Sequence, residues 1–126
     1  MNIPENLKFT QDHEWIRVEG TKGFVGITDY AQEELGDIVF VEIETVDETL
    51  EQDDVFGTIE AVKTVSDLFM PVSGKVLQVN PKIEDNPELI NQDPYGEGWL
   101  IQVTIDNPED LKKLLSAAQY EEMINA

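Results

Sequence analysis

The sequence lacks cysteine and has only one histidine, His13, among its 126 residues. Without cysteine the chain forms no disulfide, offers no thiol nucleophile and builds no cysteine-based zinc or iron–sulfur site. A single histidine also excludes a two-histidine metal centre. Asp12, His13 and Glu14 are adjacent on a predicted strand, where side chains alternate between faces, so we expect them not to converge on a metal. Because phosphate-binding glycine motifs are missing too, we expect no self-sufficient enzyme.

Long hydrophobic runs and positive charges are scarce as well. The longest run of large apolar residues, 38–41, is far shorter than a membrane span. The first residues have neither a basic nor an apolar leader pattern, so a cytoplasmic location is the simplest expectation. Eight Lys and Arg against 27 Asp and Glu give a net charge of −19. Such a charge repels nucleic acids and anionic membranes, which we do not expect as partners, and favours basic docking surfaces on other proteins.

The apolar residues that are present form short clusters between turn residues, which is typical of a mainly β domain. Strands are predicted at 14–18, 24–27, 38–43, 55–59, 75–79 and 99–105, the first two as a hairpin. The segment 38–43 is almost continuously apolar, so we expect it to be buried on both faces. In the last strand, alternation places Trp99, Ile101, Val103 and Ile105 on one face.

Signals at helix ends predict three short helices. An internal helix is expected over 29–35, with Asp29 as its N-cap and a glycine directly after its end. An Asn-Pro pair begins a second helix, over 107–115. Ser116 begins a capping box for the last helix, which ends at residue 124. We expect the two C-terminal helices to pack a stripe of leucines on the sheet.

Two segments of the chain resemble each other. Residues 36–41 are similar to residues 74–79, and an acidic, turn-rich loop follows each copy, at 44–54 and 84–93. The similarity either arises by chance or indicates two similar half-sheets related by a pseudo-two-fold axis. In the second case residues 60–70 connect the halves.

Lys63 is chemically the most unusual residue. It lies between Val62 and Val65 in a chain with few cations, with Glu60 and Asp67 further out. At a connection between half-sheets this pattern indicates a hairpin tip, which presents a primary amine to solvent. A modifying enzyme could form an amide there. The alternative is an ordinary turn lysine paired with Glu60 or Asp67.

A series of short motifs, in order and in register from residue 7 to about 124, resembles the glycine cleavage system H protein family. Each motif is short, but together they are highly specific. They lie at 10–15, 25–32, 35–39, 60–67, 71–76, 80, 87–91 and 94–100. The chain departs from the family at 42–48, where the usual Pro-then-Gly turn is missing. Ala61 and Asp12 also stand where Ser is common, and Asp12 adds negative charge.

The resemblance implies a lipoyl carrier with a barrel-sandwich hybrid fold of two small sheets, a short internal helix and C-terminal helices. The chain would then be one domain over 1–126, with its core over about 7–105 and its C-terminal helices over about 107–124. The family attaches lipoic acid to the lysine that matches Lys63.

The resemblance also suggests roles for four acidic residues. Glu14 and Asp67 would line a cleft that receives the lipoyl arm, with Asp12 close by. Glu60 would help the lipoylating enzyme to recognise the hairpin. The alternatives are that Glu14 caps the first strand, that Asp67 closes the turn, and that Glu60 is ordinary surface charge.

The function implied by the resemblance is that of a carrier which catalyses no step itself. It would shuttle the aminomethyl group of glycine from the pyridoxal-phosphate-dependent glycine decarboxylase to the tetrahydrofolate-dependent aminomethyltransferase. Electrons would pass to dihydrolipoamide dehydrogenase, and a lipoate ligase or a lipoyl/octanoyl transferase would load Lys63.

Other carrier classes have different residues around their modified lysine. Lipoyl domains of 2-oxo-acid dehydrogenases typically have Asp-Lys-Ala and a flexible linker, and biotin carriers have Met on both sides of the lysine. Neither pattern is present. A lipoyl relay that donates lipoate to other lipoyl domains needs the same lysine, so it stays open. An acidic adaptor without lipoate also stays open.

Overall fold

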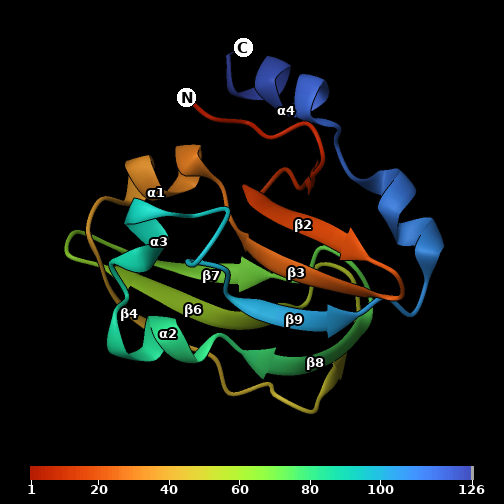
Figure 1. Cartoon of the computed structure of the whole chain (residues 1–126), viewed down its shortest axis with the longest axis horizontal. Coiled ribbons are helices and arrows are strands. Elements are labelled where there is room, and N and C mark those ends of the chain that lie inside the picture. Colours follow the sequence, from red (N-terminus) through yellow and green to blue (C-terminus); the bar gives the residue numbers. More distant parts are fainter. Residues whose placement is uncertain (126) are drawn as a thin grey trace.

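The computed structural model describes residues 1–125 as two antiparallel β-sheets accompanied by short helices (Figure 1). The larger sheet has the strand order β1-β2-β3-β9-β8-β5 and the smaller one β4-β6-β7. The strands are β1 Lys8–Phe9, β2 Glu14–Glu19, β3 Lys22–Ile27, β4 Ile38–Glu42, β5 Thr49–Leu50, β6 Val55–Ala61, β7 Val65–Phe69, β8 Gly74–Val79 and β9 Ile101–Thr104. The helices are α1 Asp29–Leu35, α2 Pro81–Asp85, α3 Leu89–Gln92, the 3₁₀ helix η1 Pro108–Lys113 and α4 Ala117–Ile124.

The two sheets enclose one apolar core. Its buried side chains come from both sheets, for example Ile16 and Val25 from the larger and Ile59 and Leu68 from the smaller. This confirms the predicted mainly β fold of two sheets. Both sheets have free edge strands, so the fold is a sandwich and not a closed barrel.

A second buried cluster joins the two ends of the chain. Leu7, Phe9, Trp15 and Tyr120 are buried together, and the rings of Phe9 and Tyr120 stack with their centroids 4.7 Å apart. Figure 1 shows α4 beside the N-terminal segment, away from the sheet faces. Helix α4 packs on the edge of the larger sheet, at β1, as expected, but it does so through Tyr120 and not through leucines. No helix within residues 1–125 is both long and apolar enough to cross a membrane.

The predicted burial of the strand at 38–43 is wrong. Ile38 in β4 is buried, but Val39 and Phe40 are 46% and 52% exposed. β4 is an edge strand of the smaller sheet. An apolar run predicts burial on both faces only when a layer covers each face, and Phe40 faces outward.

The last strand follows its predicted alternation over a shorter length. Ile101 and Val103 in β9 are buried, as expected. Trp99 lies before the strand, half-buried, with its ring edge-on to Phe24 at a centroid distance of 5.1 Å.

The three predicted helices are present, but the N-cap of the first and the type of the second differ from the prediction. Helix α1 is capped by Thr28, whose hydroxyl accepts from the N–H of Ala31, and Asp29 is its first residue. Gly36 ends α1 with φ of +80°, as predicted. The C-terminal capping box at Ser116 is present, whereas the helix expected over 107–115 is a 3₁₀ helix.

The two similar segments lie in different sheets, in β4 and β8. The sheets differ in strand number and order, so they are not equivalent halves. Residues 60–70 do not connect them, because the β6–β7 hairpin lies within the smaller sheet. The acidic segment 84–93, expected as a loop, contains the end of α2 and all of α3.

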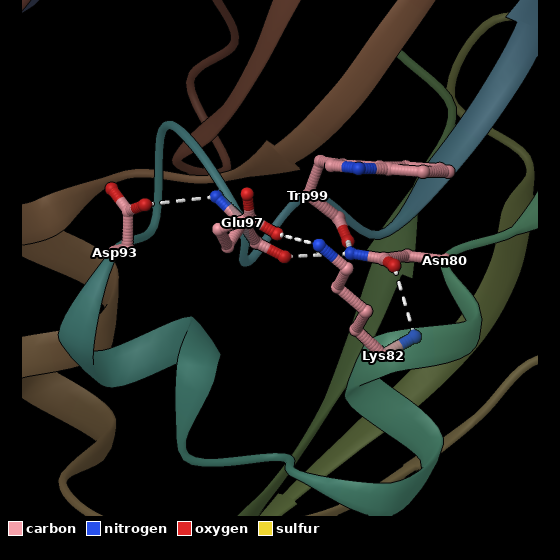
Figure 2. A network of polar contacts seen from close by, with 5 residues as sticks. All are labelled: Asn80, Lys82, Asp93, Glu97 and Trp99. Atoms are coloured by element: carbon pink, nitrogen blue, oxygen red, sulfur yellow. Dashed lines mark hydrogen bonds and ion pairs between the residues drawn. The ribbon is translucent and has the colours of Figure 1, made fainter.

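A polar network fixes this helical segment against the larger sheet (Figure 2). The buried side chain of Asn80 accepts from the N–H of Lys82 and donates to the carbonyls of Glu97 (2.7 Å) and Trp99 (2.8 Å). The Lys82 ammonium pairs with Glu97, whose N–H donates to Asp93 (2.9 Å). The network holds the chain from α2 to β9 in place.

Candidate functional site

Lys63 lies at the tip of the β6–β7 hairpin. The N–H of Ala61 donates to the carbonyl of Thr64 (2.8 Å), which leaves Val62 and Lys63 at the turn. Val62 is 75% exposed and Lys63 is exposed. No ion pair within residues 1–125 involves Lys63. The structure therefore does not support the alternative of a turn lysine paired with an acid, and it offers the amine to solvent.

The tip is anchored to the segment after α1, which α3 holds in turn. The N–H of Val62 donates to the carbonyl of Asp37 (3.1 Å), and the side chain of Asn91 in α3 donates to the carbonyl of Gly36 (2.9 Å). The Lys63 stem lies against Gly36, because a Cβ at Gly36 would be 3.2 Å from Lys63 Cε. Figure 1 shows α1, α3 and the hairpin tip at the same end of the molecule.

A cleft of about 320 Å³ opens beside this anchor. It is formed by the turn before β2, by α1 and by β7, and its lining residues are Asp12, His13, Glu14, Ile27, Tyr30, Ala31, Glu34, Leu35, Ile59, Ser66, Asp67 and Leu68. Leu35 directly precedes Gly36, against which Lys63 lies. The cleft wall at Leu35 is therefore next to the residue that the Lys63 side chain contacts.

Three of the acidic residues singled out in the sequence, Asp12, Glu14 and Asp67, line this one cleft. Asp67 lies within β7, opposite Thr58, so it does not close the turn. Glu60 is exposed and does not line the cleft. The sequence also carried no signal for Tyr30 or Ser66, because only the folded chain brings α1 next to β7.

The premise that Asp12, His13 and Glu14 lie together on one strand is wrong. β2 begins only at Glu14, and His13 adopts the left-handed conformation with φ of +70°. The hydroxyl of Thr10 accepts from the N–H groups of Asp12 (3.2 Å) and Glu14 (3.1 Å). Strand alternation does not apply in this turn, so all three residues reach the cleft. No three His, Asp or Glu side chains in the described residues are placed to share a metal ion.

Glu14 is a buried carboxyl group with 1% of its surface exposed. The hydroxyl of Thr10 donates to Oε1 (2.7 Å), and the N–H of Phe69 donates to Oε2 (3.3 Å). Burial raises the pKa of Glu14 to about 8, and the negative charges of Asp12 and Asp53 add to the effect while the two hydrogen bonds oppose it. Because Glu14 contacts β7 as well as its own turn, it does more than cap a strand.

The fold and the site define a class of protein, a carrier domain that displays one lysine on a hairpin beside an acidic cleft. Comparisons with known proteins identify the family. The family model described as Glycine cleavage H-protein matches residues 7–126. The chain is 62% identical over 126 residues to a glycine cleavage system H protein of Bacteroides fragilis, covering 100% of both chains. It is 59% identical over 125 residues to that of Bacteroides thetaiotaomicron, covering 99% of each.

A solved structure of this family has the same fold. The crystal structure of a glycine cleavage system H protein from Mycobacterium marinum superposes with a TM-score of 0.86 at 39% identity, covering 98% of this chain and 100% of that chain. The chain belongs to the glycine cleavage H-protein family. It is therefore a carrier subunit of the glycine cleavage system and not itself an enzyme, and the other components of that system are its partners.

Proposed function

We propose that Lys63 bears lipoic acid in amide linkage and that residues 1–126 act as one lipoyl-carrier domain. The carrier receives the aminomethyl group of glycine at glycine decarboxylase and delivers it to the aminomethyltransferase, and dihydrolipoamide dehydrogenase then takes up the electrons. Lipoate supplies the sulfur atoms that accept and release this group. The observation that carries the proposal is the exposed Lys63, which forms no ion pair with residues 1–125, at an anchored hairpin tip next to the cleft.

The cleft residues suit a cationic cargo. The aminomethyl group carries a protonated amine. Its N–H groups can donate hydrogen bonds to the carboxyl oxygens of Glu14 and Asp67. Glu14 is buried, so water competes poorly with this contact, and Asp12 adds negative charge at the rim. These residues hold the amine and keep water from the cargo between visits to the enzymes.

Attachment of lipoate requires an enzyme to reach the hairpin from outside. Glu60 is exposed on β6, three residues before Lys63 and opposite Phe40 and Val65 in the neighbouring strands. We propose that a lipoate ligase or a lipoyl/octanoyl transferase recognises the exposed side chain of Glu60 on β6. The cleft lies elsewhere, so recognition by the loading enzyme and storage of the cargo use separate surfaces.

The test is the intact mass of the protein expressed with active lipoylation machinery and lipoate, followed by peptide mapping. We expect one lipoyl group, on Lys63, and none on the variant Lys63→Arg. An unmodified wild-type chain, obtained while a control carrier is modified in the same cells, would contradict the proposal and favour the acidic adaptor.

A further inference from the structure

We propose that the hydroxyl group of Tyr120, on the C-terminal helix α4, is a positioning group that sets the geometry of the cleft. The inference rests on the proposed function, because it gives Tyr120 a part in retaining the cargo. Tyr120 is fully buried, and its ring stacks on Phe9. Its hydroxyl oxygen lies 2.8 Å from Nδ1 of His13 and 2.7 Å from Oγ1 of Thr28.

These two partners belong to two of the three segments that form the cleft. His13 lines the cleft itself, and its turn carries Asp12 and Glu14. Thr28 caps α1, and four residues of α1 line the cleft. One buried hydroxyl group thus links the acidic turn to the helical wall. Tyr120 does not line the cleft, so it acts on the cargo only through these segments.

One order of donation gives each hydroxyl hydrogen an acceptor. Thr28 Oγ1 already accepts from the N–H of Ala31 (3.1 Å), and within residues 1–125 its own hydrogen has no acceptor other than Tyr120. In the proposed link Thr28 donates to Tyr120, and Tyr120 donates to Nδ1 of His13. This order requires an unprotonated Nδ1 on His13 and the hydrogen on Nε2.

The arrangement also suits a cleft that receives a cation. Burial lowers the pKa of His13, although the negative charges of Asp12 and Glu34 oppose the shift. Burial raises the pKa of Tyr120 to about 12, so it stays a hydroxyl group. A neutral His13 places no positive charge beside the incoming amine, and the Tyr120 hydroxyl occupies the lone pair at which His13 would otherwise take up a proton.

The test is the variant Tyr120→Phe, which keeps the stacked ring and removes only the hydroxyl group. The matched control is Tyr95→Phe. The hydroxyl of Tyr95 also has two partners, since it donates to the carbonyl of Asn2 (2.7 Å) and accepts from the N–H of Asp29 (3.0 Å), but it does not touch the acidic turn. Thermal unfolding of both variants checks that each keeps its fold.

The first readout is the ¹⁵N NMR signal of the single histidine, recorded without any lipoate. We expect the Nε2–H tautomer in the wild type and in Tyr95→Phe, and a mixture of tautomers in Tyr120→Phe. An unchanged His13 signal in Tyr120→Phe overturns the proposed link.

The second readout is loss of the cargo from the lipoylated protein. The reduced carrier is loaded with formaldehyde and ammonium, which join one thiol as S–CH₂–NH₃⁺ with release of water, and hydrolysis reverses this reaction. We expect Tyr120→Phe to release formaldehyde about fivefold faster than the wild type, the factor typical of one lost hydrogen bond, and Tyr95→Phe to match the wild type.

Equal release from all three proteins overturns the inference and leaves the proposed function intact. A wild type that carries no lipoate overturns both. The intact mass of the wild type distinguishes these two failures before any release is measured.

Discussion

The hairpin tip and the cleft beside it hold polar groups in opposite surroundings. Lys63 is exposed, with its stem and ammonium group beside Gly36, whereas Glu14 is 1% exposed and accepts one hydrogen bond at each carboxyl oxygen. The tip is exposed to solvent, whereas the cleft combines the buried Glu14 with the exposed Asp67. In the proposed function the exposed tip gives the enzymes access to Lys63, and the buried carboxyl group in the cleft protects the cargo. Substitutions at the tip and in the cleft should therefore differ in their effects.

The largest effect is expected for Lys63→Arg. Arginine keeps the positive charge but cannot form the lipoyl amide, so glycine cleavage in a reconstituted system should fall to background. Lys63 is exposed, so the free energy of unfolding should change by less than about 0.5 kcal/mol. Lys22→Arg, at another exposed lysine, is the control and should keep full activity. Activity of Lys63→Arg equal to the wild type would show that the lysine is not the attachment site.

The next effect is expected for Glu14→Gln. Below pH 8 the empty cleft holds Glu14 protonated, and binding of the cationic cargo requires the carboxylate. Retention of the cargo by the wild type should therefore rise with pH through about 8. In Glu14→Gln it should be weaker by on the order of tenfold at high pH, as for one lost charged hydrogen bond, and independent of pH. Formaldehyde release between pH 6 and 9 measures both. A pH profile shared by both proteins would contradict the role of Glu14.

The same substitution changes the pH dependence of stability. The pKa of Glu14 is raised in the folded state, so its contribution to stability is fully present below the unfolded value near 4.5 and is lost as pH rises through about 8. Relative to Glu14→Gln, the wild type should lose on the order of a few kcal/mol between pH 5 and 9. Urea unfolding across this range tests the sign. A wild type that gains stability relative to the variant would exclude the raised pKa.

A moderate effect is expected for Gly36→Ala. Gly36 has φ of +80°, and an added Cβ would press on the Lys63 stem. We expect a loss of about 1–3 kcal/mol in the free energy of unfolding and slower lipoylation. Gly20→Ala is the matched control, because Gly20 also has positive φ (+66°) but open space around it. Both variants should be destabilised, and only Gly36→Ala should be lipoylated more slowly. Equal lipoylation rates would mean that the contact with Gly36 does not orient the lysine.

The smallest effect is expected for Asp67→Asn. Asp67 lines the cleft but is exposed, so water screens its attraction for the cationic cargo. Release of formaldehyde should rise about twofold, and the increase should vanish at high salt. An effect as large as that of Glu14→Gln would contradict the expectation that an exposed carboxyl group contributes less than a buried one.

Features that depend on neighbouring residues were predictable. The end of α1 at Gly36 follows from a glycine after a helical segment. The hairpin tip at Lys63 was predicted only through the similarity of residues 36–41 and 74–79, and its second strand, β7, was not predicted. The cap of η1 at Asn107 and the capping box at Ser116 follow from hydrogen bonds between residues two or three apart. The site residues Glu14 and Asp67 came from motif resemblance, since spacing alone did not bring them together.

The sequence by itself therefore determined the longer strands β2, β3, β4, β6, β8 and β9, the ends of α1 and α4 and a lone lysine at a turn, because these rest on local backbone preferences and short-range hydrogen bonds. The strands β1, β5 and β7 and the helices α2 and α3 were not predicted. Only the tertiary structure decided that β4 exposes Phe40, because exposure depends on which layers cover a strand. It also decided the pKa of Glu14, because burial by β7 comes from residues more than fifty positions away. The cleft itself is a tertiary feature, since its lining combines a turn, a helix and a strand that no sequence window contains.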